Sequence, residues 1–259
     1  MKSKASRFIR FLAAALLFIF LLSALFLCVR YINSRYSGTN PLILAFAKEH
    51  GLKPSDWPES LVEMLEKTPE AESFVLNYPL LHNRQQEIDL TEYLHTDSVP
   101  LFLQWDTRWG YQTYGDGMIA QTGCGPTCLS MVCVYLLDDP TLDPGYVARF
   151  SRNNGYCVPG NGTSWTLISE GGEKLGLDVT EIPLVEGIIN DHLKAGDPII
   201  CVMGPGDFTT SGHYIVLTGY EDGLFRVNDP NSPLRSQMLW DYDDIEDQVR
   251  NLWVCKVAE

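Results

Sequence analysis

Residues 119–133 read "IAQTGCGPTCLSMVC" and place three cysteines within ten positions, at the expected start of a helix. Pro126 is typical of a first helical turn, and the residues after Cys128 are apolar on nearly every face of such a helix. A helix that is apolar all round lies in the core of a protein. The stretch therefore predicts a buried helix with Cys124 at its N-terminal end and Cys133 well inside it.

Cys124 differs chemically from the two cysteines that follow it. The free N–H groups and the positive end of the dipole at a helix N-terminus favour a thiolate over a thiol. Cys128 and Cys133 have no such stabilisation, and burial favours their neutral form. We also expect Gly123 and Gly125 to leave room for a substrate backbone. Cys124 is thus the candidate nucleophile, and the other two are interpreted as core residues.

Metal and disulfide interpretations of these cysteines are weaker. Structural zinc needs two pairs of closely spaced ligands, and no second cysteine pair or His-x(3–5)-His motif is present. A disulfide between Cys124 and Cys128 would be sterically awkward within one helical turn. Cys201 and Cys255 lie in the apolar runs "PIICVM" and "LWVCKV", which predict buried strand positions. We therefore expect no metal and no cofactor.

A nucleophilic cysteine needs a base, and His213 has the most suggestive context of the five histidines. It follows the glycine-rich loop 204–212 and begins the predicted strand "HYIVLTGY". "EDG" at 221–223 predicts a hairpin turn, so the returning strand "LFRVND" brings Asp229 back beside His213. A carboxylate beside an imidazole holds the ring in one tautomer, which is what a Cys-His-acid site requires.

Three stretches carry a resemblance to a known family: "VPLFLQWD" at 99–106, "GCGPTCLSMV" at 123–132, and "GHYIVLTGY" followed by "VNDP" within 212–230. Together they resemble the cysteine peptidases of family thirty-nine in the papain clan, and the stand-alone, membrane-anchored bacterial members more than the leader-processing domains of transporters. The resemblance covers residues 98–256. It implies a papain-like fold, with Cys124 as nucleophile, His213 as general base and acid, and Asp229 as the orienting group.

The family also places a glutamine before the cysteine, where it donates to the oxyanion alongside the backbone N–H of Cys124. Gln104 follows the "VP" segment as in the family, but 19 residues separate it from Cys124. Gln121 is only three positions before the cysteine. We favour Gln104 and leave Gln121 open. The aromatic insertion at 109–117, the loop 204–212 and Trp165 are expected to shape the cleft.

The order of predicted elements gives the fold class. Helices come before an antiparallel sheet, which is the pattern of an α+β domain. The predicted helices cover 143–155, 163–176, 184–196 and 241–249, and the predicted strands cover 98–106, 198–203, 213–220, 224–229 and 252–257.

The N-terminal segment Phe11–Val29 contains 19 residues without a charge, and as a helix it would span roughly 28 Å. It is longer than the apolar region of a cleaved signal peptide, which has about 7 to 15 residues. Four basic residues precede it and two follow closely, so the positive-inside rule places the N-terminus in the cytoplasm. We expect an uncleaved signal anchor at 1–30, a linker and helical stem at 31–97, and an extracellular main domain at 98–259.

Two helices are predicted in the stem. Asp56 and Glu59 have the spacing of a capping box for the first, and Thr68 as cap with Pro69 at the first helical position begins the second.

Charge excludes one class of partner. Residues 31–259 contain 14 Lys and Arg against 33 Asp and Glu, a net charge of 14 − 33 = −19. Such a surface repels nucleic-acid phosphates and anionic lipid, so we expect no nucleic-acid partner. The loop 204–212 lacks the lysine and the following helix of a phosphate-binding loop.

These observations predict a surface-exposed thiol peptidase, held at the cell membrane by a single helix, that hydrolyses a peptide or a cell-wall peptide through a thioester intermediate. Two alternatives remain. One is a cell-wall amidase or acyl-transferase on the same scaffold, and the other is a peptide-binding module with an idle site.

Overall fold

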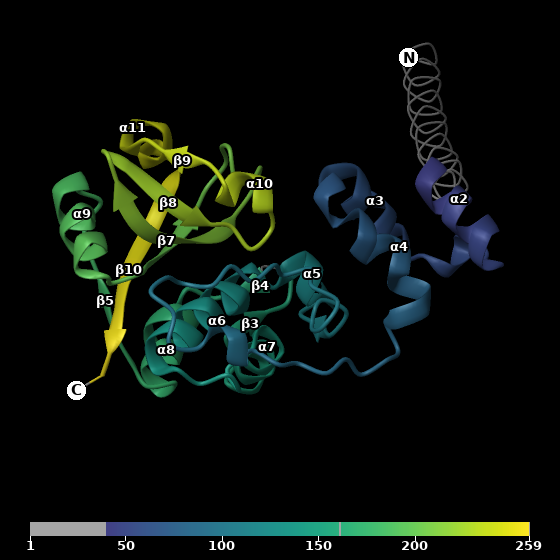
Figure 1. The fold of residues 1–259 in the computed structure, drawn as a ribbon, viewed down its shortest axis with the longest axis horizontal. Helices are drawn as coiled ribbons and strands as arrows, with labels where there is room; N and C mark the ends of the chain where they lie inside the picture. The colour runs from purple at the N-terminus through teal and green to yellow at the C-terminus, as the bar shows by residue number, and fades with distance from the viewer. Residues whose placement is uncertain (1–39, 161, 259) are drawn as a thin grey trace, which may run out of the picture. The chain divides into compact units, whose positions relative to one another are not determined.

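The computed structural model describes residues 40–160 and 162–258 (Figure 1). The described chain falls into two compact units, one ending at Lys67 and the other beginning at Thr68. The predicted membrane anchor at 11–29 lies outside the described residues. Among the residues that are described, no helix combines the length and the apolar character needed to cross a bilayer.

In residues 40–67, the described part of the smaller unit, the helices α2 (Pro41–His50) and α3 (Glu59–Lys67) are joined through the short turn η1 (Pro54–Asp56). The prediction that Asp56 and Glu59 form a capping box for α3 is wrong. The Asp56 carboxylate instead accepts a hydrogen bond from the backbone N–H of Lys53, at 2.9 Å, so it closes the preceding turn.

The second helix of the predicted stem belongs to the larger unit. Thr68 and Pro69 introduce the turn η2 (Pro69–Ala71), and α4 (Glu72–Leu81) follows directly. Thr68 makes no side-chain cap, although Pro69 takes the first helical position as predicted. A further turn, η3 (Thr91–Tyr93), precedes the region where the main domain was expected to begin.

The centre of the larger unit is an antiparallel sheet with the strand order β5-β10-β6-β7-β8-β9. Its members in chain order are β5 (Leu177–Glu181), β6 (Ile199–Met203), β7 (His213–Glu221), β8 (Leu224–Asn228), β9 (Leu239–Trp240) and β10 (Val249–Val257). Two small hairpins lie outside it, formed by β1 (Thr113–Tyr114) with β2 (Gly117–Met118) and by β3 (Cys157–Val158) with β4 (Gly162–Thr163).

Helices cover both faces of this sheet. One hydrophobic core lies between the sheet and the elements α6 (Cys124–Leu137), α7 (Pro144–Asn153), η4 (Leu167–Gly171) and α8 (Gly172–Lys174). A second core lies between the opposite face and α9 (Glu186–Ala195) with α11 (Tyr242–Ile245). Alternate residues of β6 enter the two cores, so every position of this strand is buried. The remaining short elements are α5 (Ile119–Thr122), α10 (Pro233–Ser236) and η5 (Glu246–Gln248).

The α+β class is confirmed, and most of the predicted elements form. α7 begins after the side-chain cap of Asp143, and α9 ends at Gly196 in the left-handed conformation. The helix predicted at 163–176 forms as η4 and α8. The helix predicted at 241–249 forms as two short pieces, α11 and η5. It ends one residue earlier than predicted, because β10 begins at Val249.

The strand predicted at 98–106 is wrong. This segment forms no strand and lies beside the end of β8, where the side-chain amide of Asn228 donates to the carbonyls of Val99 and Pro100. Pro100 has no N–H to offer to a strand ladder. The strand β5 was not predicted, because its alternation of buried and exposed residues is short and follows a helix directly.

Candidate active site

Cys124 is the first residue of α6, at the position predicted for it. Its side chain is half-buried, whereas every residue from Gly125 to Val134 is buried. Burial raises the pKa of the Cys128 and Cys133 thiols well above the ordinary value. Cys201 and Cys255 are also buried, as predicted, and burial raises the pKa of Cys255 to about 12. Cys124 is thus the most accessible of the three cysteines in its stretch.

The glycines beside Cys124 have a role different from the predicted one. A Cβ atom on Gly125 would come within 2.7 Å of the Thr163 side chain, and one on Gly123 would come within 2.6 Å of Ile119. Both glycines are therefore needed because the chain packs closely against itself. The expectation that they leave room for a substrate is wrong.

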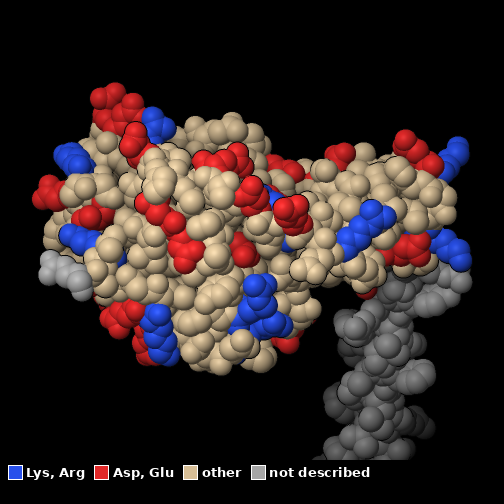
Figure 2. Space-filling model, turned by 60° about the horizontal axis from the view of Figure 1, so that its bottom comes forward, with Lys and Arg blue, Asp and Glu red and all other residues tan. Residues whose placement is uncertain are grey.

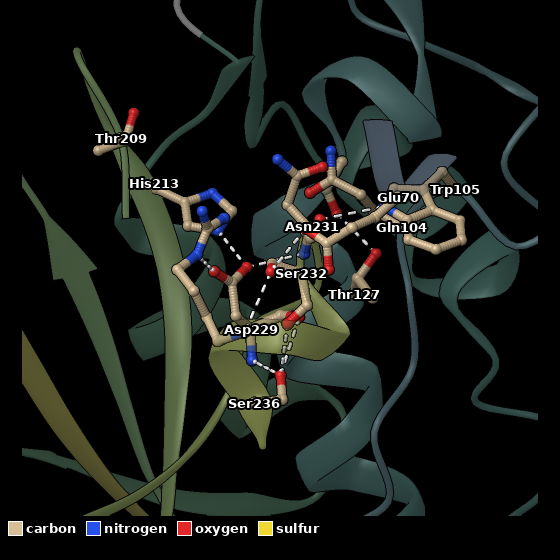
Figure 3. Close-up of polar contacts among 12 residues, drawn as sticks. Glu70, Gln104, Trp105, Thr127, Thr209, His213, Asp229, Asn231, Ser232 and Ser236 are labelled. Carbon is tan, nitrogen blue, oxygen red and sulfur yellow. Dashed lines mark hydrogen bonds and ion pairs between the residues drawn. The ribbon is translucent and has the colours of Figure 1, made fainter. Parts of the chain in front are cut away.

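The hairpin formed by β7 and β8 brings His213 and Asp229 together as predicted. Asp222 and Gly223 both have positive φ, at 51° and 92°, which suits a tight two-residue hairpin turn. Asp229 follows β8 directly and lies beside the start of β7. The His213 Nε2 and the Asp229 Oδ1 are 2.7 Å apart, and both side chains are buried (Figure 3).

Electrostatics favour the charged form of both partners. Burial alone would lower the pKa of His213, but the Asp229 carboxylate and the Cys124 side chain outweigh it and raise the pKa to about 10. Burial would raise the pKa of Asp229, yet the imidazole of His213 and the guanidinium of Arg235 hold it below its ordinary value. Because an ionised carboxylate only accepts, the proton between them belongs to Nε2 of His213. The other ring nitrogen, Nδ1, is left for Cys124.

Cys124 and His213 share the lining of one pocket of about 500 Å³. Its other walls come from the α5 segment, the β3–β4 hairpin, and the loop before β7, and the residues are Gln121, Thr122, Gly160, Gly162, Thr163, Trp165, Val202, Ser211, Gly212 and Tyr214. Trp165 is 46% exposed and packs edge-on against Trp253, so it is a wall of the pocket and not a core residue. The predicted contribution of Trp165 and of the loop 204–212 to the cleft is confirmed.

A polar network behind Asp229 was not predicted. The Arg235 guanidinium pairs with Oδ2 of Asp229, and the backbone N–H of Asn231 donates to Oδ1 at 2.7 Å. Ser236 Oγ accepts from the backbone N–H of Asp229 at 2.9 Å. Farther out, Ser232 donates to the carboxylate of Glu70 (Figure 3).

Glu70 ties the start of the larger unit to the Asp229 loop. Its carboxylate accepts from Ser232 Oγ at 2.8 Å and from the backbone N–H of Leu234 at 3.0 Å. Ser232 is itself the cap of α10, since its Oγ also accepts from the N–H of Arg235. Residue 70 lies 159 positions before Asp229 in the chain, so no local pattern in the sequence announces this contact.

Gln104 lies beside the same loop and is buried. Its backbone N–H donates to the carbonyl of Pro230 at 2.7 Å, and the neighbouring Trp105 ring donates to the carbonyl of Asn231. The side-chain Nε2 donates to the carbonyl of Ala120 at 2.7 Å, and Oε1 accepts no hydrogen bond from any residue that the structure describes. The Nε2 group has two N–H bonds, so one donor remains available.

Gln121 contacts the pocket more directly than Gln104 does. It lines the same cavity as Cys124, and its Oε1 accepts from the backbone N–H of Met118 at 3.2 Å. The carboxamide nitrogen of Gln121 makes no hydrogen bond to the described residues. Both glutamines thus remain candidates for the oxyanion donor.

The other four histidines lie in ordinary surroundings. His95 pairs with Asp138 on the surface, and His192 pairs with Asp197. The His82 ring stacks on Tyr78, and the His50 ring packs at a tilt against Phe46. None of them lines the pocket of Cys124.

A cysteine at a helix N-terminus that faces a histidine and an aspartate on an antiparallel sheet defines a cysteine-peptidase-like domain. Residues 96–255, more than half of the chain, match the family model described as "Peptidase_C39 like family". The chain belongs to this family.

Several solved structures, two of which follow, are similar to the chain. The peptidase domain of Streptococcus ComA, a bi-functional ABC transporter involved in quorum sensing, is 19% identical; the match covers 62% of this chain and 99% of that one, with a TM-score of 0.43. A putative C39-like peptidase from Bacillus anthracis is 15% identical; that match covers 67% and 100%, with a TM-score of 0.42. A search of curated proteins gives no match.

Proposed function

We propose that the chain is a thiol peptidase that hydrolyses peptide bonds at the Cys124 pocket. In this proposal Cys124 is the nucleophile, His213 is the base and then the acid, and Asp229 orients the imidazole. Gln104 supplies an oxyanion donor together with the backbone N–H of Cys124. The substrate is a peptide or a peptide of the cell wall.

One observation carries the proposal: a single buried imidazole interacts with Asp229 through Nε2 and with Cys124 on its other side. The raised pKa of His213 favours an imidazolium, which stabilises a thiolate next to it. Cys124 and His213 both line a pocket that is large enough for a peptide segment.

The geometry supports the following order of steps. The Cys124 sulfur attacks the carbonyl carbon, and the carbonyl oxygen becomes an oxyanion that the free N–H of Gln104 stabilises. His213 gives its proton to the leaving amine as the C–N bond breaks, which leaves a thioester on Cys124. Water then attacks the thioester, His213 accepts the proton of that water, and the thiolate and the new carboxylic acid separate.

The test is cleavage of a defined peptide mixture by the full chain, with products identified by mass spectrometry. We expect cleaved bonds with the native chain and none with Cys124→Ala, while Cys128→Ala retains cleavage. Release of ammonia or transfer of the acyl group to an amine, without peptide cleavage, would instead support an amidase or acyl-transferase on the same scaffold.

A non-catalytic peptide-binding module is the second candidate, and one observation favours it. Gln104 does not line the pocket, and its side-chain nitrogen already donates to Ala120. Saturable binding of peptides by the native chain, with no cleaved product and no thioester, would support this candidate over the peptidase.

We also propose that the domain faces the exterior of a bacterial cell, anchored by residues 1–30 with the N-terminus in the cytoplasm. The uncharged segment 11–29 and the four basic residues before it support this orientation. Protease treatment of intact cells tests it. The domain should be degraded from outside, and protection until the cells are lysed would contradict the orientation.

A further inference from the structure

A second pocket in the larger unit lies apart from the one described above. It has a volume of about 340 Å³ and shares no lining residue with the Cys124 pocket. Three segments form it: the chain that follows α4, the loop before β1, and α7. Arginines from all three contribute, namely Arg84, Arg108 and Arg149, and no aspartate or glutamate is among the lining residues.

This concentration of positive charge is unusual in this chain. Residues 31–259 contain only 14 Lys and Arg, so three of them converge on one pocket in a region of net charge −19. On the face shown in Figure 2, acidic side chains are spread widely and basic side chains gather in a few separate places. A multiply charged anion is repelled by most of such a surface and attracted at the pocket.

The three guanidinium groups keep free donors. The Arg84 side chain has no hydrogen-bond or ion-pair partner among the described residues. Arg149 uses Nη1 to donate to the Gln112 carboxamide, and Arg108 uses Nε and Nη2 on Asp106. Nε and Nη2 of Arg149 therefore remain available to a ligand. Arg108 also hydrogen-bonds the Tyr93 side chain, so two of its five N–H bonds remain.

The walls of the pocket are held in place by contacts within the chain. The Tyr111 ring stacks on Phe74 at 4.2 Å between centroids, and its hydroxyl donates to the Phe74 carbonyl. Arg108 lies 4.5 Å from the centre of the Trp109 ring, which limits its movement. His82 has both ring nitrogens engaged, by Tyr78 and Asn83. These parts of the wall are held in place before any ligand arrives, which lowers the entropic cost of binding.

We propose that this pocket binds a phosphate-class oxyanion, held by Arg84, Arg108 and Arg149. A phosphate group carries up to two negative charges at neutral pH and three acceptor oxygens, which matches several converging guanidinium groups better than a single carboxylate does. The planar fork of arginine favours this geometry over a lysine point charge. The glutamine amides of the lining, at 85, 86 and 112, provide further donors for the group that bears the phosphate.

Direct titration of the full chain with inorganic phosphate tests the proposal, with sodium acetate at equal ionic strength as the comparison. Calorimetry should show one saturable phosphate site that acetate occupies much more weakly. The double variant Arg84→Gln, Arg149→Gln should lose roughly tenfold in affinity for each arginine removed. Arg152→Gln is the matched control, because it removes one charge from an exposed position of the same helix that does not line the pocket, and it should leave the affinity within about twofold.

Two outcomes would overturn the proposal. One is a native chain that binds phosphate no better than acetate, and the other is an Arg152→Gln variant that loses as much affinity as the double variant. If the double variant fails to fold, Arg84→Gln alone gives the answer, since its side chain contacts no described partner. Cys124→Ala should bind phosphate normally, so this test does not depend on the proposed peptidase activity.

Discussion

The N-terminus of α6 and the β7–β8 hairpin face the same pocket, but they hold their functional side chains in different ways. Cys124 is positioned by close packing: glycines 123 and 125 contact Ile119 and Thr163, and the helix behind the cysteine is buried. Asp229 is positioned by polar groups, through Arg235, the N–H of Asn231 and Ser236. The helix side thus depends on shape, and the sheet side depends on charge and hydrogen bonds.

This difference has a consequence for mutation. A change on the helix side alters volume, so it should affect stability and the position of the sulfur together. A change on the sheet side can keep the volume and remove only a charge or a donor. Conservative substitutions of the polar network can therefore change the rate of peptide cleavage without a large change in stability.

His213→Ala should have the largest effect among the sheet-side variants. Loss of the base lowers peptide cleavage by roughly 10²- to 10⁴-fold, since proton transfer by a positioned side chain contributes about that much. Cleavage rates with the native chain and the variant measure the effect. His192→Ala is the control, because His192 pairs with Asp197 away from the pocket. Equal rates for native chain and His213→Ala would remove His213 from the mechanism.

Gln104→Ala should reduce cleavage by roughly 10²- to 10³-fold if Gln104 donates to the oxyanion. A peptide aldehyde gives a sharper measurement, because addition of the thiol to the aldehyde forms an oxygen that needs the same donor. Aldehyde affinity should fall in Gln104→Ala, while alkylation of Cys124 by iodoacetamide is unchanged. The same pattern in Gln121→Ala, with Gln104→Ala unaffected, would assign the donor to Gln121.

Asp229→Asn should lower cleavage by roughly 10- to 100-fold, because a hydrogen bond to a charged group contributes about 1.5–3 kcal/mol. The variant keeps the volume of the side chain and removes its charge. Asp207→Asn is the control, because the Asp207 carboxylate accepts a hydrogen bond from Gln248 and does not line the pocket. A fully active Asp229→Asn would show that the charge is not required.

The His213–Asp229 pair also predicts that stability depends on pH, and Asp229→Asn tests this. Because the folded-state pKa of His213 is raised, the stabilisation it gives is complete below the ordinary value of 6.5 and is lost as the pH rises toward about 10. Asp229, with a lowered pKa, contributes stability above its ordinary value of 3.8, which is lost at more acidic pH. The difference in unfolding free energy between native chain and Asp229→Asn should therefore be larger at pH 6 than at pH 9. Denaturant unfolding at both values measures it, and a difference that grows with pH would contradict the pairing.

Glu70→Ala should have the smallest effect on cleavage, below about tenfold, since Glu70 acts on Asp229 only through Ser232 and α10. Its loss removes an acceptor from the cap of this helix, which costs about 1 kcal/mol of unfolding free energy. Glu72→Ala, which changes an exposed glutamate two positions away, should leave both quantities nearly unchanged. A stability loss in Glu72→Ala equal to that in Glu70→Ala would contradict the specific contact.

The contrast between the two sides also explains what could be predicted from sequence. The pattern at 119–133 predicted the buried helix and the exposed Cys124, because helix position and burial follow from neighbouring residues. The turn at 221–223 predicted the return of Asp229 to His213, since the register of a two-residue hairpin is local. Arg235 and Glu70 were missed because their contacts depend on α10, a single turn, and on chain segments far apart in the sequence.

Two local interpretations were wrong for the same physical reason. Gly123 and Gly125 were predicted to leave room for a substrate, and residues 98–106 were predicted to form a strand. Tertiary contacts determine the role of the glycines and the conformation of that segment. Thr163 and Ile119 occupy the space beside the glycines, and Asn228 at the end of β8 donates hydrogen bonds to the carbonyls of Val99 and Pro100. No pattern within either stretch reports on those partners.

Mapping of thiol reactivity tests the central claim most directly. The full chain is treated with less than one equivalent of iodoacetamide, and the modified cysteines are identified by mass spectrometry in the native chain and in His213→Ala. In the native chain, the label should be concentrated on Cys124. In His213→Ala, labelling of Cys124 should fall at least tenfold. The half-buried Cys157 reports the reactivity of an ordinary thiol in the native chain and in the variant. Label on the buried Cys128, or labelling of Cys124 that is no faster than that of Cys157 and does not depend on His213, would contradict the account.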